Sequence, residues 1–267
     1  MRLSAKKNAV IRRLEGWGGV VVALSGGVDS ALLLALAVAA LGRERVLAAT
    51  GESPSLAGGE LDAARAIAES LGARHEVLRT RELQRAGYRA NLGDRCFHCR
   101  TELFERLGRL ALERGLPRVA YGAIADDLAD DRPGMRAAER FGVLAPLLEA
   151  GLTKPEVRAL AAATGLSVRD KPASACLASR IPVGIPVTVD RLASVDRAEA
   201  ALRRLGFRQL RVRHHGEFAR LELDPAGLRR ISDPGLRSAA VAAVRAAGFR
   251  SVTIDPDGYR PGGAGRA

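Results

Sequence analysis

The stretch GVVVALSGGVDS at residues 19–30, followed by ALLLALAVAAL at residues 31–41, decides the fold. Its first six residues are a continuous apolar run rich in β-branched side chains, which is typical of a strand buried on both faces. The glycine-containing segment 25–30 then turns the chain, and the apolar run after it predicts a helix that ends at Gly42. This order of strand, tight loop and buried helix indicates an α/β protein.

Outward from this stretch, strands and helices alternate with short connections. The sequence predicts strands at residues 45–50, 75–78 and 117–122, and helices at residues 59–71, 96–114 and 153–164. Alternation of this kind predicts a doubly wound parallel sheet. Thr153 is expected to cap the last of these helices and Gly165 to end it.

The pattern changes after residue 175, so we place a domain boundary there. Residues 190–205 are predicted to be helical, residues 208–214 and 218–223 alternate like antiparallel strands, and a helix and a last strand at 251–255 follow. We therefore expect a large α/β domain at residues 1–175 and a small α+β domain at residues 176–267.

The composition excludes several classes of protein. A chain of 267 residues with 47% hydrophobic and 27% charged residues is long and apolar enough to fold around a core, which excludes general disorder. The longest apolar run, residues 31–41, is too short to span a bilayer, and the basic N-terminus lacks the apolar core of a secretory signal. We expect a cytoplasmic protein without a membrane span.

The charge is strongly positive and unevenly distributed. The net charge is +12, and 38 of the 42 basic residues are arginines. Residues 1–175 carry a net charge of +5, whereas the shorter segment 176–267 carries +7. An arginine-rich segment suits a phosphorylated or nucleic-acid partner, because the guanidinium group matches phosphate geometry. An arginine-rich composition with solvated surfaces explains the same charge equally well.

The loop at residues 25–30 has the features of a phosphate site. Gly26 and Gly27 allow the backbone to approach an anion, Ser25 and Ser30 add hydroxyl groups, and the helix that follows offers free N–H groups. Asp29 is positioned to hold a magnesium ion that bridges phosphate oxygens. The sequence S-G-G-x-D-S, with neither a Walker A ending nor G-x-G-x-x-G, resembles the PP-loop ATP pyrophosphatases, which cleave ATP between its α and β phosphates. An accidental glycine-rich turn is the alternative, and the strand–loop–helix context argues against it.

Three cysteines provide the second chemical signal. Cys96 and Cys99 form a C-x-x-C pair at the start of a predicted helix, and Cys176 follows 77 residues later. Three thiolates are one short of a closed zinc or iron–sulfur set, which would leave an iron site open for chemistry. Small buried hydrophobes, a zinc site completed by His98, and a redox pair are the alternatives.

Several segments together resemble one family. These are DRCFHCRTELF, YGAIADDLADDRPGMRAAERFGV, APLLEAGLTKPEVRAL, DKPASACLASRIPVG and RVRHHGEFARLEL. They resemble the LarE family, the ATP-dependent sulfur transferases that build the nickel-pincer nucleotide of lactate racemase. The resemblance runs from about residue 20 to residue 260 and is most specific around Cys176. It implies a PP-loop domain at residues 1–175 and a substrate-binding and oligomerisation domain at residues 176–267.

The resemblance also implies a reaction. In this family, ATP adenylates a carboxylate of pyridinium-3,5-biscarboxylic acid mononucleotide, and a cysteine thiolate displaces AMP. The sulfur stays with the substrate as a thiocarboxylate, and the cysteine becomes dehydroalanine; Cys176 matches this sacrificial position. Members with three cysteines are described as holding a [4Fe-4S] cluster that delivers sulfide instead, and Cys96, Cys99 and Cys176 match that subset. The implied cofactors are ATP, magnesium and a [4Fe-4S] cluster.

The resemblance also implies roles for individual residues. Ser179 and Arg180 would flank the substrate site, and Glu199 would bind a metal near the cysteine, although an ordinary exposed helix glutamate is the alternative. Arg211 and Arg213, which alternate on one strand face, would grip the phosphate of a pyridinium nucleotide. A solvated strand edge explains that alternation equally well. The family also suggests a homo-oligomer, with a hexamer as the expected form.

Three further positions are less defined. Phe97 stands where some members have a tryptophan, which puts a stacking role on the pyridinium ring in doubt. The acidic residues Asp126, Asp127, Asp130 and Asp131 look like a metal cluster, but a capped turn is the preferred interpretation. The segment 53–55 follows the second strand and is expected to line the adenine pocket.

Three other functions compete with this assignment. A tRNA-thiolating PP-loop enzyme would also combine the loop with three cysteines, but no added RNA-binding domain is recognisable, so a nucleic-acid partner is not expected. An amidating synthetase would share the loop and need no cysteines. A non-catalytic ATP-binding or iron–sulfur regulatory protein has no need of Asp29 and Cys176, which this chain retains.

Overall fold

The computed structural model describes residues 2–129, 133–172 and 175–260. The chain divides into two compact units. The first contains residues 1–53, 59–82 and 96–174, and the second contains residues 54–58, 83–95 and 175–267. Two short segments that precede residue 96 therefore belong to the second unit. The boundary at residue 175 as a functional division remains a prediction.

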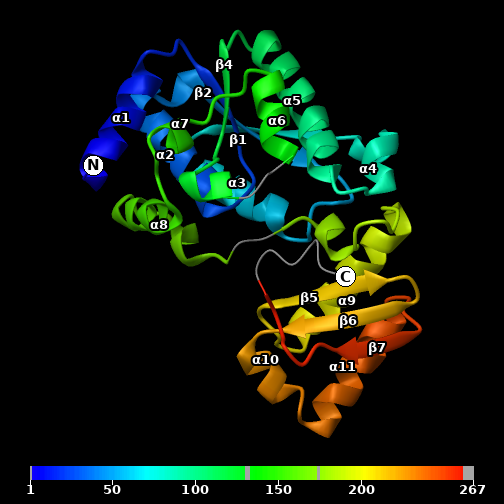
Figure 1. Ribbon diagram of the computed structural model, residues 1–267. Coiled ribbons are helices and arrows are strands. Elements are labelled where there is room, and N and C mark those ends of the chain that lie inside the picture. The colour runs from blue at the N-terminus through cyan, green and yellow to red at the C-terminus, as the bar shows by residue number, and fades with distance from the viewer. Residues whose placement is uncertain (1, 130–132, 173–174, 261–267) are drawn as a thin grey trace. The chain divides into compact units, whose positions relative to one another are not determined.

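The first unit is built on a four-stranded parallel sheet (Figure 1). Its strands are β1 (Val20–Ala23), β2 (Val46–Glu52), β3 (Arg74–Arg79) and β4 (Arg118–Tyr121), in the order β3-β2-β1-β4. Because β1 pairs with β2 on one side and with β4 on the other, the strand order reverses at β1. A reversal of this kind opens a crevice at the carboxyl ends of the strands, where α/β proteins bind their ligands.

Helices cover both faces of this sheet. Those of the first unit are α1 (Leu3–Glu15), α2 (Val28–Leu41), α3 (Glu60–Ser70), α5 (Arg95–Glu113), α6 (Pro133–Arg140), α7 (Pro146–Glu149) and α8 (Lys154–Ala163). Val20 and Val22 of β1 pack into one core with α1, α2, α3 and α8, whereas Val21 packs into a second core with α5 and α6. The buried side chains of β1 thus alternate between the helix layers on the two faces of the sheet. The predicted doubly wound α/β fold is confirmed.

The second unit is a small α+β structure. Its sheet has the order β5-β6-β7, formed by β5 (Leu210–His215), β6 (Phe218–Leu223) and β7 (Ser251–Ile254). The hairpin β5–β6 is antiparallel, as predicted, and β7 joins β6 in parallel. The helices are α4 (Ala86–Ala90), α9 (Val189–Arg204), α10 (Pro225–Arg230) and α11 (Pro234–Ala246). Val212 and Leu221 are fully buried and pair across the hairpin, and β5 contacts α9. Arg211 and Arg213 alternate with Val212 along β5, so they lie on the other face of the sheet.

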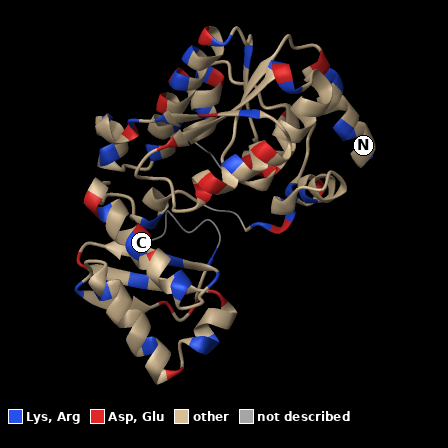
Figure 2. Cartoon of the chain, turned by 180° about the vertical axis from the view of Figure 1, so that it is seen from behind, with Lys and Arg blue, Asp and Glu red and all other residues tan. Residues whose placement is uncertain are grey.

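Within the described residues, no helix is both long and apolar enough to cross a bilayer. Basic residues are spread over the helices and strands of the second unit, as Figure 2 shows.

The start of α8 is fixed by a capping box, as the sequence predicts for Thr153. The Glu156 carboxylate accepts hydrogen bonds from the Thr153 N–H at 2.9 Å and from its hydroxyl at 3.1 Å. Lys6 of α1 reaches the same carboxylate at 2.7 Å. These contacts satisfy groups that a helix end leaves unpaired, and they hold the first residue of α8, Lys154, in place.

We expect Thr153→Ala to lower the free energy of unfolding by about 1 kcal/mol, because the cap loses its side-chain oxygen. Urea denaturation at neutral pH measures this change. Thr164→Ala, the same substitution at the exposed far end of α8, is the control and is expected to cost less than about 0.5 kcal/mol. Equal losses in the two variants would contradict a specific role for the capping box.

Candidate active site

The loop at residues 25–30 connects β1 to α2 and is closed by its own side chains. The Ser30 hydroxyl accepts a hydrogen bond from the Ser25 N–H and donates one to the Gly27 carbonyl, both at 3.1 Å. Gly26 has a φ of 78°, and a Cβ at this position would lie 3.1 Å from the Glu60 carbonyl oxygen. A side chain is therefore excluded there by both backbone conformation and space. The loop residues Ser25, Gly26, Gly27, Asp29 and Ser30 come together at the start of α2.

Behind the loop lies a hydrogen-bond chain that the sequence did not reveal. The Thr50 hydroxyl donates to the Leu24 carbonyl at 2.7 Å, so it must accept from His75 Nε2, which lies 2.8 Å away. Burial lowers the pKa of His75, and the nearby Arg65 adds to this lowering. A neutral His75 with its proton on Nε2 satisfies the chain, which holds the peptide just before Ser25.

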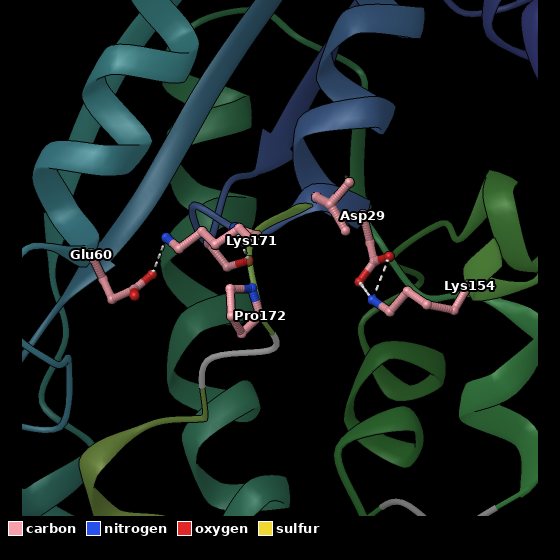
Figure 3. Close-up of a pocket in the computed structure, with 8 residues that line it drawn as sticks. Asp29, Glu60, Lys154, Lys171 and Pro172 are labelled. Atoms are coloured by element: carbon pink, nitrogen blue, oxygen red, sulfur yellow. Dashed lines mark hydrogen bonds and ion pairs between the residues drawn. The ribbon is translucent and has the colours of Figure 1, made fainter. Parts of the chain in front are cut away.

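A small cavity of about 120 Å³ opens beside the loop (Figure 3). Its walls are formed by Ser25, Gly27, Val28, Asp29, Glu60, Lys154, Lys171 and Pro172. Pockets that hold whole small-molecule ligands are typically about 300–1,000 Å³, so this space suits phosphate groups rather than a whole nucleotide. All of the lining residues belong to the first unit.

Two ion pairs lie on the cavity walls. Lys154 Nζ contacts both carboxylate oxygens of Asp29, at 2.8 and 2.6 Å. Lys171 Nζ contacts Glu60 Oε2 at 2.8 Å and the Gly26 carbonyl at 3.0 Å. These contacts join distant parts of the chain, since 125 residues separate Lys154 from Asp29, 111 separate Lys171 from Glu60 and 145 separate Lys171 from Gly26.

Lys154 and Glu60 were not predicted as site residues, and Lys171 was not assigned to the phosphate loop. A signal was present at Lys154. It is the first residue of α8, where the partial positive charge of the helix N-terminus disfavours a cation. A lysine at this position needs a compensating anion, and Asp29 supplies it.

The cysteines lie on two different units. Cys96 and Cys99 are three residues apart in the first turns of α5, so their side chains share one side of the helix. Cys176 immediately precedes a short 3₁₀ helix, η5 (Leu177–Arg180), in the second unit. Cys96 and Cys176 are exposed and Cys99 is partly exposed. Among the described residues, no group of three histidine, cysteine or acidic side chains forms a metal site, and the cluster remains a prediction.

Ser179, Arg180 and Glu199 meet inside the second unit. Glu199 is fully buried, and both of its oxygens contact the guanidinium of Arg180, at 2.8 and 3.1 Å. Arg203 and the Val212 N–H also bind this carboxylate. Arg180 further donates to the Ser179 hydroxyl and to the carbonyls of residues 175 and 176. The metal-binding role of Glu199 remains a prediction, and it would require some of these contacts to open.

The two strand arginines have different surroundings. Arg213 is paired with Glu222 at 2.8 Å and donates to the Ser179 carbonyl at 2.7 Å. Arg211 is also buried, but in the part of the chain that the structure describes it has no carboxylate partner. Its guanidinium lies over the Tyr259 ring and donates to the Arg260 carbonyl at 3.4 Å. Burial lowers the pKa of Arg211, and the Arg180 and Arg213 cations add to this lowering.

The structure describes all of the remaining predicted positions except Asp130 and Asp131. Phe97 packs edge-on against His98, and the Arg136 guanidinium lies over its ring. Asp127 accepts the Ile124 N–H at 3.0 Å and Asp126 accepts the Lys154 N–H at 2.8 Å, so both side chains bind backbone groups of the fold. Asp130 and Asp131 lie outside the described residues. Ser53 belongs to the first unit and donates to Glu82, whereas Pro54 and Ser55 belong to the second, so the adenine role of segment 53–55 remains a prediction.

Comparison with known proteins relates this chain to one family model and to three proteins. The NAD synthase family model matches residues 7–102, which contain the loop. An uncharacterised protein of Synechocystis is 42% identical to this chain, over 91% of this chain and 90% of the length of that protein. The pyridinium-3,5-bisthiocarboxylic acid mononucleotide synthase of Lactiplantibacillus plantarum is 37% identical over 97% of this chain and 94% of its own. A tRNA-specific 2-thiouridylase of Parasynechococcus marenigrum is 38% identical, but over only 46% of this chain.

The parallel sheet, its glycine loop and the polar cavity beside it define a PP-loop enzyme that uses ATP. The match over nearly the whole length of the synthase narrows this class further. The chain belongs to the LarE family, whose members are ATP-dependent sulfur transferases.

Proposed function

We propose that this protein adenylates a carboxylate of pyridinium-3,5-biscarboxylic acid mononucleotide and converts it to a thiocarboxylate, as a step in making a nickel-pincer nucleotide. The observation that carries this proposal is the 37% identity to a synthase named for the bisthiocarboxylic product, which extends over 97% of the chain. We further propose that the protein acts in the cytoplasm as a homo-oligomer.

The first unit supplies the activation step. The loop N–H groups and the start of α2 provide donors for phosphate oxygens, and Lys154 and Lys171 provide cations beside them. The carboxylate of Asp29 at this cavity is a hard oxygen donor and fits magnesium, with Glu60 as a second carboxylate nearby. A bound magnesium ion would neutralise charge that develops on the departing pyrophosphate.

The second unit supplies the substrate site and the thiol. Arg211 is buried and forms no ion pair with a carboxylate among the described residues, which supports its role as the phosphate ligand of the nucleotide. Cys176 is exposed, and Arg180 holds the backbone just before η5 through the carbonyls of residues 175 and 176. A thiolate at Cys176 would attack the adenylated carbon, and AMP would leave with the bonding electron pair.

Three thiols also suit iron. The C-x-x-C pair places Cys96 and Cys99 on one side of α5, as two ligands of one cluster require, and Cys176 would be the third. A bound cluster would supply an alternative source of sulfide.

Anaerobic incubation with substrate, ATP and magnesium tests the proposed function. We expect AMP, pyrophosphate and a product in which sulfur replaces one carboxylate oxygen, all measured by mass spectrometry. The unphosphorylated nucleoside is the control and is expected to react far more slowly at the same concentration. If AMP forms only with tRNA, or if no sulfur-containing product appears, the proposed substrate is wrong.

Arg211→Ala and Arg213→Ala are expected to differ. Loss of Arg211 should weaken binding of the phosphorylated substrate by about tenfold to a hundredfold, since hydrogen bonds to charged groups are worth about 1.5–3 kcal/mol. Loss of Arg213 removes the shorter of the two ion pairs that buried Glu222 forms among the described residues, leaving Arg220 at 3.5 Å, and should lower the free energy of unfolding by about 1–3 kcal/mol.

Calorimetric titration of substrate and denaturant unfolding, applied to both variants, separate the two effects. Magnesium-dependent ATP binding is the internal control and should stay unchanged in Arg211→Ala. Equal losses of ATP and substrate affinity in Arg211→Ala would show that Arg211 has only a structural role.

A further inference from the structure

The phosphate cavity of the first unit is electrically balanced by its own side chains. Figure 3 shows one lysine–carboxylate pair on each side of the cavity, Lys154 with Asp29 and Lys171 with Glu60. A polyphosphate needs the two cations, and a magnesium ion needs carboxylate oxygens. In the structure, however, these groups bind each other.

The two pairs are not equivalent. Lys171 also donates to the Gly26 carbonyl, so it is tied to the backbone of the loop as well as to Glu60. For the Lys154 ammonium, in contrast, Asp29 is the only partner among residues 2–129, 133–172 and 175–260, and it uses both carboxylate oxygens. The Lys154 ammonium therefore becomes available for a phosphate only when Asp29 finds another cation.

The backbone of Lys154 keeps the ammonium close to the site. Its N–H is bound by Asp126 at 2.8 Å, and it follows the Thr153–Glu156 capping box. A release of the ammonium from Asp29 therefore needs only side-chain rotation, without movement of α8. Because the ammonium stays close to the site, it can pass directly from the Asp29 carboxylate to a bound anion.

We propose that Asp29 makes the site selective for the magnesium complex of the nucleotide, by holding Lys154 until the metal arrives. This inference rests on the proposed function, in which Asp29 is the magnesium ligand. When magnesium binds Asp29, Lys154 loses its partner and becomes a ligand of the polyphosphate. A metal-free polyphosphate meets instead a lysine that is already paired and a carboxylate that repels it.

Calorimetric titration with α,β-methylene-ATP, which the enzyme cannot cleave at the α–β bridge, tests this proposal. Each protein is titrated once with EDTA and once with magnesium. The wild type is compared with Asp29→Asn, which releases Lys154, with Lys154→Met, and with the double variant. Asp126→Asn is the matched control, because it removes the same charge next to Lys154 but leaves the Asp29 pair intact.

In EDTA, Asp29→Asn is expected to bind the analogue about tenfold more tightly than the wild type, since a repelling carboxylate is removed and a cation is released. Magnesium should no longer increase the affinity of Asp29→Asn for the analogue. Lys154→Met should weaken binding in magnesium, and the double variant should lose the tenfold gain, which shows that the gain acts through Lys154. Asp126→Asn should bind in EDTA like the wild type.

The proposal is overturned if Asp29→Asn binds the metal-free analogue no better than the wild type, or if Asp126→Asn gains as much. It is also overturned if the double variant keeps the gain of Asp29→Asn. If the wild type fails to bind the analogue even in magnesium, the result is a different one. The assignment of the nucleotide site, and with it the proposed function, would then be wrong.

Discussion

Asp29→Ala is expected to abolish magnesium-dependent pyrophosphate release, with a loss of at least about a hundredfold in turnover. The physical reason is that the charge developing on the departing pyrophosphate loses the metal that neutralises it. The loop itself should remain formed, because its closing hydrogen bonds come from Ser25 and Ser30 and not from Asp29. AMP and pyrophosphate, measured at saturating ATP and substrate, give the rate.

Asp126→Asn is the control for this variant, because it removes a charge near Lys154 and keeps an acceptor oxygen for the Lys154 N–H. It should retain pyrophosphate release. Wild-type rates in Asp29→Ala would show that the loop assignment is wrong. A rate lost in Asp29→Ala together with tighter metal-free binding in Asp29→Asn would separate the two roles of this carboxylate, in turnover and in selectivity.

The loop was predictable from sequence because all of its signals are local. The apolar run at residues 19–24, the two glycines and the apolar helix after them are adjacent, and each has a direct conformational consequence. The hairpin β5–β6 was predictable for the same reason, since its alternation and its turn at Gly216 lie within 14 residues, Leu210–Leu223.

The electrostatics of the cavity were not predictable, because the partners are distant in sequence. Lys154 and Asp29 are 125 residues apart, and nothing in the sequence pairs a lysine in α8 with a carboxylate in α2. Similarly, segments 54–58 and 83–95 carry no local sign that they belong to the second unit, where Leu177 binds the Ser55 carbonyl and Gly184 binds that of Asn91.

Alternation also failed to distinguish Arg211 from Arg213. It places both on one face of β5, and the resemblance to the LarE family assigns both to the substrate phosphate. Arg213 forms an ion pair with Glu222, which lies directly across the hairpin from Arg211, so only the side-chain geometry shows which guanidinium is left without an ion pair. The side-chain contacts thus give Arg211 and Arg213 different expected effects, one on substrate binding and one on stability.

Cys176→Ala is expected to retain formation of the adenylated substrate but to produce no thiocarboxylate. Adenylation depends on the phosphate loop and on the cavity beside it, and neither of these contains any of the three cysteines. Sulfur transfer, in contrast, needs a sulfur nucleophile. Loss of product should therefore be complete, while pyrophosphate release in a single turnover should persist. Cys96→Ala is the informative companion variant, because it keeps the Cys176 thiol and removes one ligand of the predicted cluster.

The mass of the protein after turnover identifies the sulfur source. If Cys176 is sacrificed, its thiolate first forms a thioester; loss of the Cα proton then breaks the Cβ–S bond, and the sulfur leaves with the substrate. The protein would lose the mass of one hydrogen sulfide and stop after one turnover. We expect the other outcome, an unchanged Cys176 in iron-stripped protein and repeated turnover of reconstituted enzyme when sulfide is supplied, because the chain keeps Cys96 and Cys99 at metal-ligand spacing. A mass loss at Cys176 in iron-free protein, with full activity in Cys96→Ala, would defeat the cluster route and leave the sulfur-transferase function in place.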